Sequence, residues 1–366
     1  MQLQTLSILN FKNIEEAELN FSPKINCFLG NNGMGKTNLL DAVYYLSFCK
    51  SHFNSVDSQN IKYDADFFML KGKYEVNGAE EEISCGIKRR QKKHFKRNKK
   101  EYERLSDHIG MLPLVMISPD DAELIQGGSD ERRKFIDGAI SQYNKLYLNN
   151  LLNYNNILQQ RNFLLKKDDK IDESLFDVLD EQLCEFGDYI FHQRDDFIEE
   201  FTPIFQQFYG AISGGNEYIS LEYKSQHANG ELITRMKEAR MRDKILGFST
   251  LGVHKDELEM TLESYPIKRA GSQGQCKTFA VSLRLAQMVF LKKNYGFAPV
   301  LLLDDIFDKL DAQRVERIIE LVAGNDFGQI FITDTNRKYL DEILSRINHD
   351  SAIFMVENGK ISKQEH

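Results

Sequence analysis

The sequence predicts an α/β fold in which a phosphate-binding loop joins a buried strand to a helix. An apolar run over residues 25–29 indicates the strand, and the pattern Gly-x-x-x-x-Gly-Lys-Thr follows it at 30–37. Apolar residues then recur at helical spacing over 36–48. Near the other end, an apolar strand at 300–303 ends in two aspartates. Strand, glycine loop, helix and a distant acidic strand are typical of a P-loop lobe.

The loop supplies groups that suit a nucleoside triphosphate. Its residues are Gly30, Asn31, Asn32, Gly33, Met34, Gly35, Lys36 and Thr37. Glycines let backbone N–H groups point inward around the phosphates, and the helix N-terminus adds partial positive charge. We expect Lys36 to reach the β- and γ-phosphates and the Thr37 hydroxyl to hold Mg²⁺. The alternative is an ordinary Gly/Asn turn, but the flanking strand and helix argue against it.

Composition bounds the class of protein. A chain of 366 residues is long enough for two domains. Its net charge of −8 argues against a protein that is basic overall, although a local basic patch can still bind nucleic acid. Five cysteines are scattered without Cys-x-x-Cys spacing, which favours reduced thiols in a cytosol. With neither a signal peptide nor an apolar run of membrane length, we expect a cytoplasmic protein with no membrane partner.

The elements follow in order along the chain. Residues 1–30 predict two strands before the P-loop strand, and residues 61–118 predict a β-rich part with short strands. These short strands are expected at Phe67–Leu70, Lys73–Val76, Glu82–Ile87 and Leu114–Ile117. Helical periodicity then covers residues 130–158 and 175–208. A loop is expected at 210–216, a strand at 218–223 and a helix at about 231–246.

In the last third of the chain, predicted helices and strands alternate again. Helices are expected at 282–291 and 315–322, and strands at 300–303 and 330–333. The two α/β ends must form one domain, because an acidic strand of this kind lies close to its P-loop strand. We therefore predict an ATPase-type lobe from residues 1–120 plus 265–366, with a β-rich subdomain, and an inserted, mainly helical lobe from 121–264.

Polar residues at the ends of the two late strands suit the same site. Asp304 is placed to reach Mg²⁺ through water or through Thr37. Asp305, one residue further, is placed to orient and deprotonate an attacking water. Thr333 ends the next strand, where its side chain can sense the γ-phosphate. The alternatives are a buried strand with a polar end for the aspartates and a solvated loop for Thr333 and for Asp308-Lys309-Leu310-Asp311.

A second glycine loop precedes the helix that leads to the acidic strand. Its candidate binding residues are Ser272, Gly274 and Gln275. A single chain has no second triphosphate for this loop, so we expect it to act on the nucleotide of a partner subunit. The alternative is a serine N-cap on a flexible loop.

A strongly basic run lies between residues 88 and 100. It holds nine lysines and arginines in thirteen residues and no acid. Short β-like arms around Arg97-Asn98-Lys99 predict a hairpin. The run is either a solvated surface or a contact to a phosphate backbone, and both interpretations stay open.

In combination these motifs resemble the ABC-type ATPase head, and more narrowly the RecF family, the recombination and repair ATPases of bacteria. The closer match is carried by Asn10–Ile14, Leu29–Leu46, Ser118–Asp121, Arg132–Asp137, Thr250–Leu258 and Ser272–Leu285. They span nearly the whole chain, and the absence of a long coiled coil also fits RecF proteins better than SMC-type relatives.

The resemblance implies function and partners. It implies a monomer that dimerises when ATP is sandwiched between the P-loop of one subunit and the Ser272 loop of the other. It further implies DNA binding by the dimer, on single-stranded or gapped DNA, with weak DNA-stimulated ATP hydrolysis. The implied role is replication and recombinational repair, including gap repair, the SOS response and recombinase loading with RecR and RecO.

The sequence departs from the family pattern at four positions. Lys12 stands where arginine is frequent, Phe53 where arginine usually follows Ser-His, Val253 where proline is usual, and Gln273 where the wider signature loop has glycine. The usual Q-loop glutamine has no clear counterpart, and 118–121 is the candidate segment.

Two other functions compete with this interpretation. A transporter motor subunit is disfavoured by the missing Leu-Ser-Gly-Gly-Gln form, by Thr333 in place of a switch histidine and by the large helical insertion. A small-molecule P-loop kinase leaves the Ser272 loop and the Asp-x-Leu-Asp motif without a role.

Overall fold

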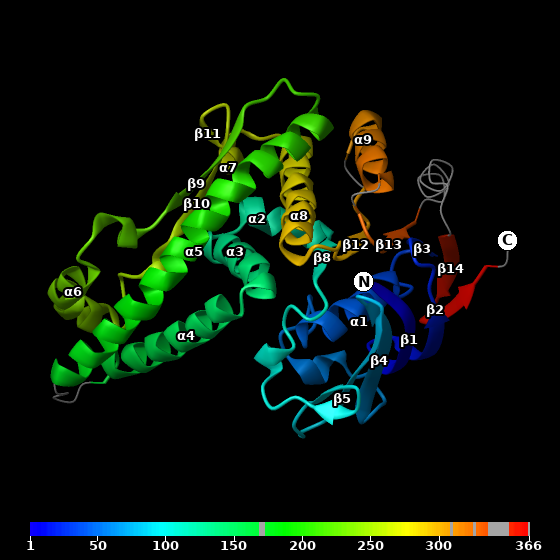
Figure 1. Cartoon of the computed structure of the whole chain (residues 1–366), viewed down its shortest axis with the longest axis horizontal. Helices are drawn as coiled ribbons and strands as arrows, with labels where there is room; N and C mark the ends of the chain where they lie inside the picture. The colour runs from blue at the N-terminus through cyan, green and yellow to red at the C-terminus, as the bar shows by residue number, and fades with distance from the viewer. Residues whose placement is uncertain (168–172, 308–309, 325–326, 336–350, 365–366) are drawn as a thin grey trace. The chain divides into compact units, whose positions relative to one another are not determined.

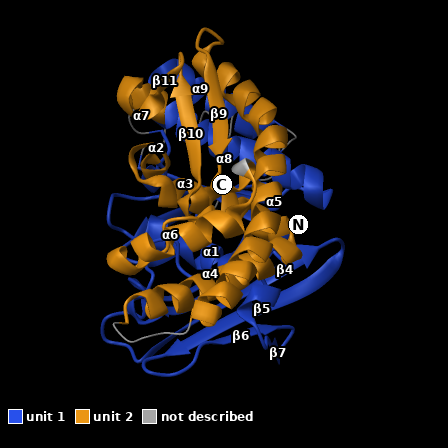
Figure 2. Cartoon of the chain, turned by 90° about the vertical axis from the view of Figure 1, so that its left-hand side faces the viewer, with its two compact units in different colours: residues 1–121, 277–366 blue, residues 122–276 orange. Residues whose placement is uncertain are grey.

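The computed structural model describes residues 1–366 except 168–172, 308–309, 325–326, 336–350 and 365–366. The chain divides into two compact units. The first consists of Met1–Asp121 with Lys277–His366, and the second of Ala122–Cys276 (Figure 2).

One sheet of the first unit is antiparallel throughout. Its strands are β1 (Gln2–Phe11), β2 (Ile14–Asn20), β4 (Phe67–Val76), β5 (Ala79–Lys88), β6 (His94–Arg97) and β7 (Lys100–Glu101). They are ordered β2-β1-β4-β5-β6-β7. Buried and exposed residues alternate strictly along β4, because one face packs on the core and the other meets solvent. The two short strands predicted at 67–70 and 73–76 are therefore one continuous strand.

The second sheet of this unit carries the P-loop strand. Its strands are β3 (Ile25–Leu29), β8 (Leu114–Ile117), β12 (Val300–Asp304), β13 (Ile330–Asp334), β14 (Ser351–Glu357) and β15 (Lys360–Lys363). They are ordered β15-β14-β3-β13-β12-β8, and only β15 is antiparallel to its neighbour (Figure 1). Every residue of β3 and β12 is buried, which explains their continuous apolar sequence. Because β3, β13 and β12 run parallel, the P-loop and the aspartates that follow β12 lie at the same edge of the sheet.

Helix α1 (Lys36–Phe48) lies between the two sheets. It contacts β1, β4 and β5 of the antiparallel sheet and β8, β12 and β13 of the other. Leu39, Leu40 and Leu46 are fully buried there. The helix that follows the P-loop therefore lies within the hydrophobic core of the first unit.

Two further helices flank the acidic strand in sequence. Helix α8 spans Gln273–Tyr295 and α9 spans Ala312–Ala323. The predicted helix at 282–291 is therefore only the buried part of a longer one. Asp311 caps α9 by accepting a hydrogen bond from the Arg314 backbone N–H at 2.9 Å.

The second unit is mainly helical but contains a small sheet. Its helices are α2 (Ala122–Gln126), α3 (Ser129–Tyr143), α4 (Lys145–Leu165), α5 (Glu173–Ser213), α6 (Leu232–Leu246) and α7 (Ile267–Ala270). The strands β9 (Ile219–Lys224), β10 (Glu257–Leu262) and β11 (Tyr265–Pro266) are ordered β11-β10-β9. The loop predicted at 210–216 is wrong for its first half, because α5 continues to Ser213 with Ile212 fully buried. None of the described helices is both long and apolar enough to cross a membrane.

Buried ion pairs link the helices of the second unit. The Arg161 side chain of α4 is completely buried and donates to Asp180 of α5 at 2.6 Å and to Asp243 of α6 at 2.7 Å. Asp180 also accepts from Arg240 of α6 at 2.7 Å. One buried carboxylate therefore serves two guanidinium groups, and its removal takes a buried partner from both, leaving Arg161 with Asp243 and Arg240 with the more exposed Glu173 and Asp177.

We predict that Asp180→Ala lowers the free energy of unfolding of the second unit by about 3–5 kcal/mol, because both arginines lose a buried partner. Urea unfolding followed by circular dichroism measures the change. Asp177→Ala is the matched control: this carboxylate also pairs with Arg240 but is 42% exposed, so little change is expected. Equal effects of the two substitutions would contradict the assigned role of burial.

Candidate functional site

The P-loop adopts the conformation that its glycines permit. Gly33 and Gly35 have φ angles of +80° and +114°, a region that other residues rarely adopt. The Lys36 ammonium is nearly buried and donates to the carbonyls of Gly30 at 2.7 Å and Asn31 at 3.2 Å. The lysine therefore lies across the loop that its own backbone forms.

The predicted metal-binding and sensing residues meet at one carboxylate oxygen. Oδ1 of Asp304 accepts hydrogen bonds from the Thr37 hydroxyl at 3.0 Å and the Thr333 hydroxyl at 2.6 Å. Burial raises the pKa of Asp304, and the two hydroxyl donors oppose that rise. The parallel register that sets Asp304 beside Thr333 creates this cluster.

Asp305 begins the loop after β12 in a strained conformation. Its φ is +46°, and its backbone N–H donates to the Thr333 hydroxyl at 3.2 Å. Asp305 is partly exposed, unlike the buried Asp304. The two adjacent aspartates thus differ in setting: one is held by hydroxyl groups, and the other faces a region that water can reach.

Two turns distant in sequence brace the P-loop. The Asn13 amide, in the turn between β1 and β2, donates to the Met34 carbonyl at 3.2 Å and accepts from Asn38 at 2.8 Å. In the turn between β14 and β15, the Gly359 N–H donates to the same Met34 carbonyl at 2.9 Å. No contact with the P-loop was predicted for Asn13 or Gly359; the local signals were the Asn10–Ile14 motif and the Asn358-Gly359 dipeptide, which favours a tight hairpin turn.

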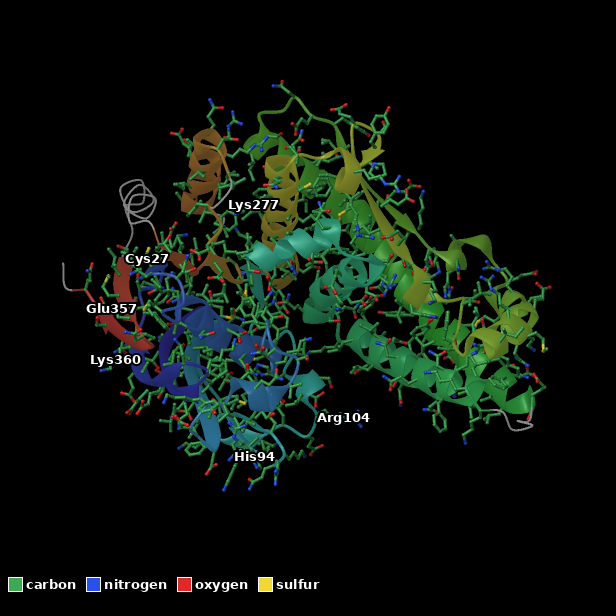
Figure 3. The ribbon with its side chains drawn as sticks, turned by 180° about the vertical axis from the view of Figure 1, so that it is seen from behind. Cys27, His94, Arg104, Lys277, Glu357 and Lys360 are labelled. Atoms are coloured by element: carbon green, nitrogen blue, oxygen red, sulfur yellow. The ribbon has the colours of Figure 1, made fainter. Side chains whose placement is uncertain are left out.

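A cavity of about 330 Å³ adjoins the start of the loop. It is lined by Gly30, Asn31, Met34, Met355, Glu357 and Asn358. A Cβ atom at Gly30 would lie 2.3 Å from the Val356 carbonyl oxygen, so β14 approaches the loop as closely as glycine allows. Figure 3 labels Glu357 and Lys360, which lie opposite each other in the antiparallel register of β14 and β15.

The cluster fits a triphosphate with Mg²⁺. Lys36 provides a cation, Gly33 and Gly35 leave the loop backbone uncovered, and Thr37 with Asp304 provides two oxygen ligands. Among the described residues, no group of three or more His, Cys, Asp or Glu side chains could hold a metal ion alone. If Mg²⁺ bound here, Thr37 and Asp304 would hold it, and phosphate oxygens and water would supply the remaining ligands, as is usual for this ion.

The Ser272 loop belongs to the second unit, whereas the P-loop belongs to the first. The Ser272 hydroxyl accepts from the Gln275 N–H at 3.2 Å, and the Gln275 side chain accepts from the Ser272 N–H at 2.8 Å. This reciprocal capping box begins α8. Ser272 is exposed, whereas Gln275 is partly buried and its amide donates to Glu217 at 2.8 Å; Gly274 lies in the first turn. Within a single chain, Ser272 therefore acts as an N-cap, which is the alternative interpretation drawn from the sequence.

Two further predicted features remain, and one of them is only partly described. Asp308 and Lys309 of the Asp-x-Leu-Asp motif lie outside the described residues. In the candidate Q-loop segment, Asp121 accepts two hydrogen bonds from Arg284 of α8, at 2.9 and 2.7 Å.

Two of the four residues that depart from the family pattern, Lys12 and Phe53, lie close together. The Lys12 ammonium lies 2.6 Å from the buried Asp41 carboxylate and 5.1 Å from the centre of the Phe53 ring. Phe53 therefore packs against a lysine whose charge is already paired with Asp41.

The parallel sheet, the P-loop and the Asp304 cluster define the class: an ABC-type P-loop ATPase head. A family model described as "RecF/RecN/SMC N terminal domain" matches residues 2–362. The chain is 60% identical over 366 residues to the DNA replication and repair protein RecF of Bacteroides fragilis strain YCH46, covering 100% of this chain and 99% of the relative. It is 51% identical over 363 residues to RecF of Porphyromonas gingivalis strain ATCC 33277, covering 99% and 100%.

Solved structures agree with these relatives. A structure of the recombination mediator protein RecF with ATP, from the RecFOR pathway, matches with a TM-score of 0.88 at 30% identity, covering 100% of this chain and 98% of that one. An Smc head bound to the C-terminal winged-helix domain of ScpA matches with a TM-score of 0.60 at 15% identity, covering 100% and 98%, and so shows the fold alone. The chain belongs to the RecF/RecN/SMC N-terminal domain family and, within it, to the RecF proteins.

We predict that Gly35→Ala weakens binding of a fluorescent ATP analogue by more than about tenfold. The new Cβ would lie 2.8 Å from the Asn13 amide, and the backbone strain adds about 1–3 kcal/mol. Gly33→Ala is the control: it is strained at +80° but has no heavy atom within 4 Å of the new Cβ, so a smaller loss is expected. Equal losses would show that contact with Asn13 does not matter.

Proposed function

We propose that this protein is an ATP-dependent DNA-binding protein of DNA replication and recombinational repair. It binds single-stranded or gapped DNA as an ATP-driven dimer, hydrolyses ATP slowly, and helps to load recombinase with RecR and RecO. The observation that carries the proposal is the Lys36, Thr37 and Asp304 cluster on a RecF-type fold. We also propose a cytoplasmic location, since DNA is the substrate and the cysteines are free.

Residues 30–37 hold the triphosphate in this proposal. Backbone N–H groups and Lys36 neutralise phosphate charge, and Thr37 with Asp304 holds Mg²⁺. When bound, Mg²⁺ supplies Lewis-acid stabilisation of charge on the phosphate oxygens. Thr333 keeps Asp304 in place and links it to the Asp305 backbone.

Asp305 acts as the base that orients and deprotonates water. Its support is position: it is the first residue beyond the buried metal-binding aspartate and is partly exposed. The Asp305 backbone N–H donates to the Thr333 hydroxyl, which itself donates to Asp304. The same hydroxyl therefore positions the backbone of Asp305 and the carboxylate of Asp304.

Dimerisation places Ser272, Gly274 and Gln275 on the partner's nucleotide. The capping box leaves the helix N-terminus accessible, and that terminus favours anionic groups. The loop then completes a nucleotide site that one chain leaves open, which makes assembly depend on ATP.

The transporter interpretation is not supported by the comparisons, because the relatives reported above are DNA replication and repair proteins. The chain matches them over nearly their whole length.

We predict that Asp305→Asn binds ATP with parental affinity but hydrolyses it at least about 100-fold more slowly, because the amide keeps the shape and loses the basic oxygen. Dimers should accumulate with ATP and retain DNA, as measured by light scattering and by anisotropy of labelled gapped DNA. Lys36→Ala is the contrasting variant and should lose ATP binding and ATP-dependent DNA binding together. Parental hydrolysis by Asp305→Asn would place the base elsewhere.

We predict that Ser272→Arg blocks ATP-driven dimerisation while the monomer binds ATP normally, since the loop acts only on the partner's nucleotide. Size-exclusion chromatography with light scattering measures the dimer, and equilibrium dialysis measures ATP. Ser272→Thr, which keeps a capping hydroxyl, should still dimerise. A Ser272→Arg protein that dimerised with ATP would refute the trans role.

A further inference from the structure

The outer face of the antiparallel sheet carries apolar and basic side chains together. We define the β4–β6 face as the outward residues of the three adjacent strands β4, β5 and β6 from the Phe67–Lys88 pair to the Lys71–Ser84 pair; Lys73, Glu75, Glu80 and Glu82 lie beyond it, further along β4 and β5. Its members are Phe67, Met69, Lys71, Ser84, Gly86, Lys88, His94 and Lys96. Phe67 and Met69 are 39% and 44% exposed, on a sheet face that would ordinarily be polar.

Strand register aligns these side chains in rows. Phe67 lies opposite Lys88, and Met69 lies opposite Gly86, which in turn lies opposite His94. Residues directly opposite share one face of the sheet and lie within contact distance. A neighbouring row runs from Lys71 through Ser84 to Lys96. The register thus places an exposed aromatic ring among cations.

Gly86 leaves the middle of this face open. A Cβ built there would have no heavy atom within 4 Å, so the space between the Met69 and His94 side chains of this row is not filled by neighbouring side chains. Nothing in the conformation requires glycine, because Gly86 does not have a positive φ. The glycine therefore leaves a gap between the side chains of Met69 and His94.

The basic run divides into internal and outward cations. Lys93 is internal: its ammonium donates to the Cys49 carbonyl at 2.6 Å, pairs with Asp57 at 2.8 Å and lies over the Tyr45 ring. Arg97 pairs with Glu81 at 2.5 Å. Six other side chains make no hydrogen bond or ion pair with any described residue: Lys88, Arg90, Lys92, Lys96, Lys99 and Lys100.

Two nearby acids pair with members of this face, Lys71 and His94, and no described acid forms an ion pair with the six cations named above. Glu82 pairs with Lys71 at 2.9 Å and Glu101 with His94 at 3.0 Å, so both already have partners. Asp64 and Asp66 lie exposed in the segment just before β4, and Glu75 and Glu80 lie exposed at the opposite end of β4 and β5. Figure 3 labels His94 at this end of the sheet, where side chains project away from the ribbon.

We propose that the β4–β6 face binds single-stranded nucleic acid, with Phe67 stacking on a base and the outward lysines contacting phosphates. An unpaired strand presents both a π-face and a charged backbone, whereas a duplex keeps its bases stacked inside. The outward lysines attract the phosphate backbone of any nucleic acid, and the exposed Phe67 ring favours a single strand because only unpaired bases can stack on it. The inference rests on the proposed DNA function and names the surface and form of DNA involved.

The protein contains no tryptophan, which provides a direct test. Phe67→Trp places a single indole on the face, and titration with oligo(dT) at low salt should quench its emission to saturation. A fully paired duplex of equal length should quench it little. Phe248→Trp is the matched control: Phe248, in the second unit, is 42% exposed and has the Lys255 ammonium 4.9 Å from its ring centre. No quenching at position 67, or equal quenching at 248, would overturn the proposal.

Salt dependence separates stacking from charge. Phe67→Ala should weaken oligo(dT) binding by roughly fivefold or more without changing the slope of log affinity against log salt, and Phe67→Tyr should restore it. Charge reversal at Lys92, Lys96 and Lys99 should flatten the slope by about 0.7 per lost contact. Lys93 is left intact because it belongs to the fold.

The outcomes distinguish this proposal from the general function. Unchanged oligo(dT) affinity in Phe67→Ala, with ATP-dependent binding of gapped DNA preserved, overturns the β4–β6 face alone. Loss of all DNA binding by the parent protein overturns both.

Discussion

The buried carboxylate of Asp304 is the interaction on which the candidate site depends. A carboxylate removed from water is unfavourable unless donors surround it, and here the donors come from two other elements, through Thr37 of α1 and Thr333 of β13. The same atoms therefore join the P-loop helix, the acidic strand and the strand between them. Parallel pairing of β12 with β13 sets the position of the carboxylate.

The P-loop also depends on both ends of the chain. Asn13 reaches it from the first hairpin and Gly359 from the last, and both bond the Met34 carbonyl. A Cβ at Gly359 would lie 2.2 Å from the Asn13 carbonyl oxygen, so these turns are themselves in close contact. The first unit must therefore assemble from residues on both sides of the second before the loop is fully braced.

Charge is distributed unevenly in this acidic protein. In the second unit, arginines such as Arg161 are buried against carboxylates, where they contribute to the arrangement of the helices. Along the hairpin after β5, cations remain outside. Lys92 and Lys93 are adjacent in sequence, yet one is exposed and the other is held by Asp57 and a backbone carbonyl.

The sequence by itself determined the α/β class, the P-loop, the acidic strand and the basic hairpin. Each depends on spacing within about ten residues, which local periodicity and glycine chemistry govern. It also predicted the residues that meet at Asp304, but not the geometry by which they meet. Only the tertiary structure decided that Asn13 and Gly359 brace Met34, that Lys93 is internal, and that Phe67 lies beside Lys88. These contacts depend on strand register and on packing between distant segments, for which a single sequence carries no periodic signal.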